Sequence, residues 1–305
     1  MKKTALLGSV LALCAYTAAA ETHWVYGVYQ EGDEVYGWYD ADKNGNNDSA
    51  LCWAAVSSNL INWWQDQYVT PNGVPTGDAV WSTYRSYAKN TMGTTQAGVE
   101  WWLTGNGGAD LGLDLFNSTK GYYGAYESDP YSIYFDGKYV YGVGYDNDWQ
   151  EYHNTANELS LAIYNALNKD NGRVGIGLNI GPSPSSVWHG VTLWGAEFSD
   201  DLTLTALYLT DSDDATAYSG GDMDLFKVNV QYKNYNGKEY LYLEDYWNSS
   251  LRYVESLTLF DATQTDAWGM ERLYFTMPDT TVPEPATATL GLMALAALAF
   301  RRRRA

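Results

Sequence analysis

The sequence has 305 residues, with 37 acidic against 18 basic side chains and a formal net charge of −19 at pH 7. A protein this acidic repels phosphate backbones, which argues against nucleic acid as a partner. The length allows one large domain or two small ones, and the 46% hydrophobic share is enough for a sizeable core.

The first twenty residues have the pattern of an export signal. A positive start at Lys2 and Lys3 precedes an apolar stretch over Ala5–Ala15, and Ala18–Ala20 offers the small side chains that signal peptidase needs. A membrane-spanning helix takes about 20 apolar residues, so this stretch is too short to be an anchor. We therefore predict a signal peptide over 1–20. The sequence around Cys14 loosely resembles a lipoprotein box, which leaves lipidation as an alternative.

The segment after the signal leads into a single cysteine. Residues 24–39 are rich in Trp, Tyr and Val and predict a strand or extended segment. A polar loop over 40–49 follows, and the apolar spacing in Ala54–Tyr68 predicts a helix that begins near Cys52. Because Cys14 leaves with the signal, Cys52 has no partner for an intramolecular disulfide. The start of a helix favours a thiolate, so Cys52 is a candidate nucleophile, although a buried inert thiol fits the count equally well.

The middle of the chain predicts two more helices. The first is short, around Ala97–Leu103, and ends at Gly105. Residues 104–152 are dense in Gly, Tyr and Asp and predict irregular loops with short strands. The second helix covers Thr155–Lys169, where Thr155 and Glu158 have the spacing of a capping box.

Strands follow and bring in the remaining candidate residues. We predict strands over Val174–Ile180, Gly190–Phe198 and Leu202–Leu209, with further strands over Leu225–Phe275. His189 lies at the start of the second of these strands, either as a core histidine or as a base held against the thiol. Asp211 follows the third, where a carboxylate could accept a hydrogen bond from the imidazole Nδ1–H. An acidic turn at a strand end would give the same pattern without a function.

Six motifs then follow one another along the chain: Gly37–Lys43, Leu51–Ala55, Asn59, Trp63–Trp64, His189–Ala196 and Thr210–Asp213. In kind and order they resemble the IdeS/Mac family of immunoglobulin-degrading cysteine endopeptidases. The resemblance covers roughly Gly37 to Asp214. It implies an α+β protein with a papain-like fold, in which an N-terminal helical part carries the cysteine and a C-terminal antiparallel β part carries the histidine and aspartate.

The resemblance also implies a role for each residue. Cys52 is the nucleophile, His189 the general base and acid, and Asp211 the residue that orients the imidazole. Asp213 matches a second acidic position near the histidine. Lys43 matches a lysine whose backbone amide forms the oxyanion hole together with the amide of Cys52.

The activity implied is hydrolysis of peptide bonds in a protein substrate through an acyl-enzyme, with no cofactor required. Trp53 stands where the immunoglobulin-cleaving members have glycine, so the substrate need not be an immunoglobulin. Two other functions stay open at this point. A transglutaminase-type acyltransferase uses the same three residues, and a non-catalytic surface binding module would keep the fold alone.

The loop before Cys52 also follows the start of a calcium-binding EF-hand loop. It places oxygen-bearing side chains at alternate positions: Asp40, Asp42, Asn44, Asn46 and Asp48. Gly45 occupies the sixth position, as in an EF-hand. The twelfth position is Leu51 instead of the glutamate that binds through both oxygens. Calcium is therefore a possible ligand, and an Asn-Gly turn explains the same residues without it.

The C-terminal end has three parts in order. A Pro-rich break at 282–285 precedes an apolar run over Ala286–Phe300 and a basic cluster at Arg301–Arg304. This tail resembles the PEP-CTERM signal, which exosortases process. A plain tail anchor is the alternative, but the apolar run spans only ~22 Å as a helix, which is short for a bilayer. We expect a peptidase domain over 21–280, a sorting tail over 281–305, and a location at the cell envelope or outside the cell.

Overall fold

The structure is a computed structural model that describes residues 21–45, 47–105, 121–124, 139–143, 154–214 and 224–274. The chain divides into two units, Met1–Leu273 and Tyr274–Ala305. The predicted signal peptide lies outside the described residues, as does the sorting tail. Within the described part, no helix is long and apolar enough to cross a membrane.

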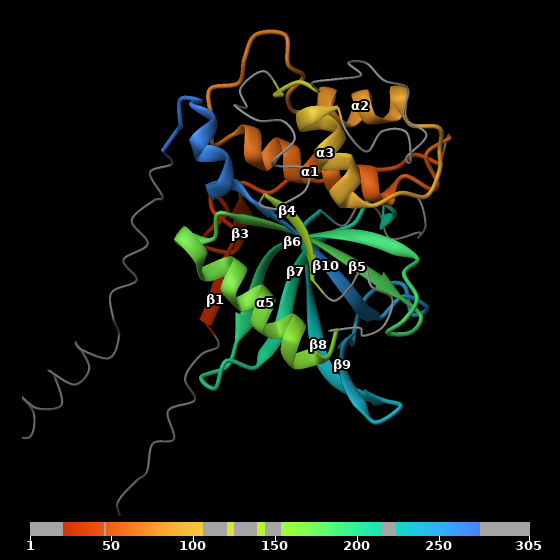
Figure 1. Cartoon of the computed structure of the whole chain (residues 1–305). Helices are drawn as coiled ribbons and strands as arrows, with labels where there is room; N and C mark the ends of the chain where they lie inside the picture. The colour runs from red at the N-terminus through yellow and green to blue at the C-terminus, as the bar shows by residue number, and fades with distance from the viewer. Residues whose placement is uncertain are drawn as a thin grey trace, which may run out of the picture. The chain divides into compact units, whose positions relative to one another are not determined.

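Three of the described helices lie in the N-terminal part of the first unit (Figure 1). They are α1 (Cys52–Gln65), α2 (Asp78–Tyr87) and α3 (Thr95–Thr104). The predicted helix near Cys52 is confirmed, and every residue of α1 is buried. The predicted helix before Gly105 is confirmed as α3, which Gly105 ends in the left-handed conformation at φ 81°. The sequence did not predict α2, which buries only Val80 and Tyr84.

The C-terminal part is an antiparallel sheet. Its main strands are β5 (Val174–Gly181), β6 (His189–Phe198), β7 (Leu204–Thr210), β8 (Phe226–Tyr235), β9 (Lys238–Leu243) and β10 (Tyr253–Asp261). The hydrogen-bonded order runs β6-β5-β10-β9-β8-β7, and β7 also pairs with β6, so these strands close on themselves. The protein is thus α+β, with helices early and strands late, as predicted.

Smaller elements complete the unit. The strands β1 (Glu21–Trp24) and β4 (Val140–Val143) extend the sheet beside β6 and β10, while β2 (Tyr29–Glu31) and β3 (Glu34–Tyr36) form a separate hairpin. The extended segment predicted over 24–39 therefore contains two short strands, β2 and β3, and the last residue of β1. Two short 3₁₀ helices lie at Lys169–Asn171 and Ala262–Trp268.

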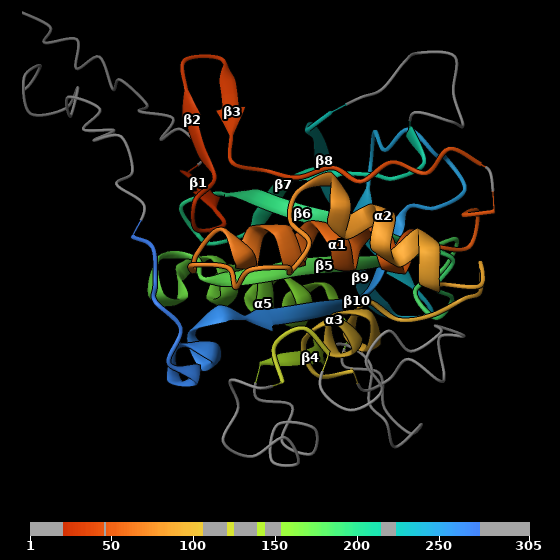
Figure 2. The ribbon, with the colours of Figure 1, turned by 90° about the horizontal axis from the view of Figure 1, so that it is seen from above.

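The predicted long helix is present as α5 (Ala156–Asn168). The predicted capping box also forms, because the Thr155 amide donates to the Glu158 carboxylate at 3.0 Å. The helix covers strands on the side away from α1 (Figures 1 and 2). Its buried residues, among them Leu159 and Ile163, join the core that α1 and the sheet share.

Two glycines of β5 set the distance between the sheet and α1, which lies along the strand (Figure 2). A Cβ atom on Gly175 would lie 2.8 Å from carbon atoms of Leu60 and Trp63, and one on Gly177 would lie 2.9 Å from Val56 Cγ1. Both approaches are closer than carbon atoms tolerate. The helix therefore packs directly on the strand backbone, which brings its first residue to the start of β6.

The last described segment of the first unit is held at the other end of α1. The amide of Leu273 donates to the carbonyl of Gln67 at 2.8 Å, and the amide of Val69 donates to the carbonyl of Glu271 at 2.8 Å. Gln67 and Val69 follow directly after α1. The chain thus leaves this unit near the C-terminal end of the helix that begins with Cys52.

Candidate active site

Cys52 is the first residue of α1 and is buried against the start of β6. Burial alone would raise the pKa of its thiol. The hydrogen bond with His189 and the charges of His189 and Lys43 outweigh burial, with help from the amide of Gly190, and the pKa lies below its ordinary value. These interactions stabilise the thiolate relative to the thiol, as a nucleophilic cysteine requires.

His189 is the first residue of β6 and is almost fully buried. Its Nε2 atom lies 2.5 Å from Asp211 Oδ1. Burial lowers the pKa of the imidazole, but the charge and hydrogen bond of Asp211, together with Cys52, raise it to about 10. The imidazole is thus protonated at neutral pH. The sequence predicts Nδ1 toward the Asp211 carboxylate; in the structure Nε2 faces it, and Nδ1 lies toward Asp213.

Asp211 follows β7 and has no exposed surface. Besides His189, it accepts hydrogen bonds from the Tyr246 hydroxyl, from Trp247 Nε1 at 2.9 Å and from the Asp213 amide at 3.0 Å. Burial would raise the pKa of this carboxyl, but the charge of His189 and these donors hold it below its ordinary value. A charged carboxylate with fixed oxygens can hold the imidazole in one orientation.

Asp213 and Lys43 form an ion pair on the other side of His189, in which Lys43 is buried and Asp213 is 30% exposed. Lys43 Nζ lies 2.7 Å from Asp213 Oδ1 and donates to the Ser49 carbonyl at 3.1 Å. Asp213 Oδ2 lies 3.5 Å from His189 Nδ1. The backbone amide of Lys43 donates to the Ser212 carbonyl at 2.9 Å. The amide that we assigned to the oxyanion hole is therefore already paired, while the Lys43 ammonium lies at the site.

The five predicted residues thus come together, from the loop before α1, from α1, from β6 and from the turn after β7. Sequence reasoning missed Tyr246 and Trp247, which donate to Asp211 from the segment after β9. A Tyr-Trp pair far along the chain carries no motif that would connect it with a histidine more than fifty positions earlier. Only the closure of the sheet brings this segment to Asp211.

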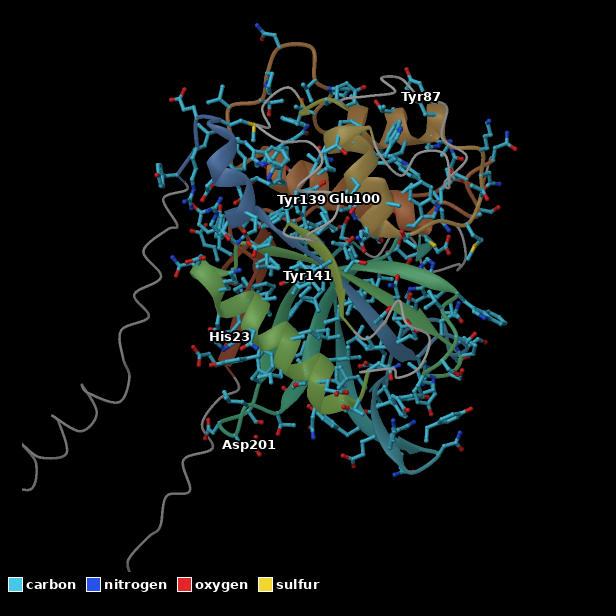
Figure 3. The ribbon with its side chains drawn as sticks, in the orientation of Figure 1. His23, Tyr87, Glu100, Tyr139, Tyr141 and Asp201 are labelled. Atoms are coloured by element: carbon cyan, nitrogen blue, oxygen red, sulfur yellow. The ribbon has the colours of Figure 1, made fainter. Side chains whose placement is uncertain are left out.

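Among the other histidines, His23 lies elsewhere. Its ring packs edge-on against Tyr164 of α5 and Phe198 of β6, near the far ends of these elements (Figure 3). His153 lies outside the described residues. The choice of His189 as the partner of Cys52 therefore agrees with the geometry.

The predicted calcium loop does not form one set of ligands. Asp48 pairs with Arg85, at 3.3 Å between its Oδ2 and Nε, and accepts from the Asn44 amide at 3.0 Å. The side-chain oxygen of Asn44 accepts from Arg85 Nη2 at 3.0 Å. A guanidinium thus sits where these oxygens would bind a cation. Asn46 lies outside the described residues.

The other two predicted ligands, Asp40 and Asp42, lie near Asp214. One carboxylate oxygen each from Asp40, Asp42 and Asp214 lie within 4.8 Å of one another. Asp214 belongs to the turn after β7, far along the chain from the predicted loop. Calcium binding by the loop stays a prediction.

Two family models match separate segments of the chain. Residues 20–75 match the family model described as Mac 1, and residues 281–305 match the model of the PEP-CTERM protein-sorting motif. Both matches agree with the resemblances drawn from the motifs. The Mac 1 match includes Lys43 and Cys52 but ends before His189. No curated protein matches the chain.

The sorting motif has direct consequences. A PEP-CTERM tail places the protein at the cell envelope or outside the cell, as predicted, and implies processing by an exosortase. The Mac 1 match suggests a cysteine peptidase-type domain between the signal and this tail.

Proposed function

We propose that the chain is an exported cysteine endopeptidase with a papain-like fold. The observation that carries the proposal is the buried array in which His189 contacts both Cys52 and Asp211. A lowered thiol pKa beside a raised imidazole pKa is the ion pair that a cysteine peptidase uses. The partial family match over the cysteine segment supports the same reading.

The first chemical step is attack of the Cys52 thiolate on a peptide carbonyl. The Cys52 amide is among the first amides of α1, which have no acceptor within the helix and can therefore bind the developing oxyanion. One such donor lowers the barrier by about 2.7–4 kcal/mol in a serine peptidase. Lys43 acts here through its ammonium charge, since its own amide donates to Ser212.

The second step belongs to His189. Protonated in the resting state, it gives its proton to the leaving amine, and the acyl group stays on the Cys52 sulfur. The neutral imidazole then takes a proton from water as the water attacks the thioester. Asp211 holds the ring through both steps, and the donors from Tyr246 and Trp247 hold Asp211.

Digestion of a proteome-derived peptide library tests the proposal. We expect the protein purified from the exported fraction to cleave internal peptide bonds, and Cys52→Ala to abolish cleavage while the fold is kept. New isopeptide bonds to added amines in place of cleavage would favour the acyltransferase. If neither product forms and the thiol reacts only after denaturation, a non-catalytic binding module is the function that remains.

A further inference from the structure

Glu255 on β10 is a buried carboxyl that the proposed chemistry does not use. Its side chain is 3% exposed, and within the part of the chain that the structure describes its Oε2 atom has no hydrogen-bond partner. Burial raises the pKa of this carboxyl, and a hydrogen bond with Ser256 offsets the effect only in part. A buried polar atom without a partner is costly, so its presence needs an explanation.

The register of the sheet connects the neighbour of Glu255, Ser256, with the start of β6 beside Cys52. A bulge between Val254 and Ser256 gives β10 one extra residue, and Ser256 then lies opposite Asn179 of β5. Asn179 donates to the Ser256 hydroxyl at 2.9 Å and lies opposite Gly190 of β6 on its other side. Directly opposed residues have Cβ atoms about 5 Å apart, so these side chains form one short row.

This row ends at the nucleophile. A Cβ atom built on Gly190 would lie 3.9 Å from the Cys52 carbonyl group and 3.5 Å from Val56. One built on Gly177, two residues before Asn179, would contact Val56, Thr95 and Thr258. At Gly177 this face of β5 is thus contacted by Val56 of α1 and Thr95 of α3. Asn179 lies past the first residue of α1, where its side chain is only partly buried.

We propose that Glu255 is the specificity-determining residue of the peptidase and receives a lysine or arginine side chain of the substrate near the scissile bond. The inference rests on the proposed function. An ammonium or guanidinium group would supply the donor that Oε2 lacks, and the resulting charge-assisted hydrogen bond would be shielded from water. Ser256 and Asn179 would direct the entering side chain toward the carboxyl. The acidic surface would also attract basic segments of a substrate.

The cleavage sites found in the peptide library test this role of Glu255. We expect the cleavage sites of the wild-type protein to share a lysine or arginine at one fixed position. Two synthetic peptides that differ only there, lysine against methionine, should then differ in kcat/KM by about tenfold or more. In Glu255→Gln, which keeps the size of the side chain but removes its charge, the two kcat/KM values should become similar. Glu239→Gln, which changes an exposed carboxyl on β9, should keep the wild-type ratio.

Each other outcome overturns the inference in a recognisable way. Cleavage sites without a shared basic position would overturn it while leaving the peptidase intact, and so would an unchanged ratio in Glu255→Gln. If Glu255→Gln does not fold, as shown by its melting curve, the wild-type ratio alone decides, and a ratio near one overturns the inference. No cleavage of any peptide by wild type would remove the proposed function and this inference together.

Discussion

At the scale of single residues, two opposite charges held in a buried space decide how Cys52 reacts. His189 owes its raised pKa to Asp211 and Cys52, and the Cys52 thiol owes its lowered pKa to His189 first and to Lys43 after it. Each group therefore keeps the other charged. Removing the charge of Asp211 should weaken both shifts at once.

This dependence gives a prediction for Asp211→Asn. Without the carboxylate, the pKa of His189 falls and the pKa of Cys52 rises, so less thiolate is present at pH 6. A rise of one unit in the thiol pKa leaves about tenfold less thiolate below that pKa. We expect wild type to be alkylated by iodoacetamide at pH 6 faster than a free cysteine, and Asp211→Asn to react about tenfold more slowly than wild type.

Asp201→Asn is the matched control, because Asp201 is an exposed carboxylate in the turn between β6 and β7 (Figure 3). It should react at the wild-type rate. Equal rates in wild type and Asp211→Asn would show that Asp211 does not support the ion pair.

Cys52 and His189 could be singled out from the sequence because their residue types are scarce. Once the signal is set aside, Cys52 is the only cysteine, and His189 is the one histidine at the start of an apolar strand. What each atom does was less predictable. The Lys43 amide is paired with Ser212, and the imidazole presents Nε2 to Asp211, and both depend on how the turn after β7 folds back. Spacing along a sequence carries no record of such turns.

At the scale of elements, the position of the nucleophile depends on how deeply α1 rests on β5. Gly177 leaves no room for a methyl group beneath Val56. We expect Gly177→Ala to lower the free energy of unfolding by about 1–3 kcal/mol, the usual cost of an overpacked core. It should also lower kcat/KM in the protein that remains folded, because the helix carries Cys52 away from His189.

Gly142→Ala provides the comparison. Gly142 also lies in a strand, β4, but an added Cβ there would lie 3.8 Å from its nearest neighbour, an ordinary contact. The free energy of unfolding and the kcat/KM of Gly142→Ala should stay close to those of wild type. Equal kcat/KM values in Gly177→Ala and wild type would mean that the depth of α1 does not set the geometry of the site.

Local signals were sufficient for most elements. The apolar periodicity and the capping box predicted α5, and runs of β-branched and aromatic residues predicted β5, β6 and β7 to within a few residues. The helix α2 was missed because only two of its residues are buried, which leaves a weak periodicity. The pairing of β6 with β7 on one side and β5 on the other closes the sheet, and such long-range register follows from packing more than from local pattern.

At the scale of the whole molecule, Arg173 connects three distant segments. It donates from Nε to Gln67 at 3.0 Å, from Nη2 to the Tyr68 hydroxyl at 3.0 Å, and from Nη1 to Asp266 at 2.7 Å. Gln67 and Tyr68 follow α1, while Asp266 belongs to the last 3₁₀ helix. The start of β5 is thereby joined to the end of the first helix and to the last part of the unit.

Arg173→Met should therefore destabilise the fold. The substitution keeps much of the apolar stem but removes the donor to the buried Gln67 side chain and the ion pair with Asp266, which keeps its contacts with Tyr68 and Arg272. The loss at Gln67 alone should cost roughly 2 kcal/mol. The melting temperature should fall by several degrees. Lys227→Met, which removes a surface pair with Glu197 from a side chain 44% exposed, should change stability by about 0.5 kcal/mol or less. Similar melting temperatures for the two variants would contradict this view of Arg173.

The backbone hydrogen bonds that join Glu271 and Leu273 to the segment after α1 have one more consequence. They fix the exit of the chain beside Gln67, whereas Cys52 opens the same helix, whose fourteen residues span about 21 Å. The nucleophile and the anchored end of this unit therefore lie at opposite ends of one helix. A force applied to the chain at Leu273 would first strain these two hydrogen bonds, and it would reach Cys52 only through the length of α1.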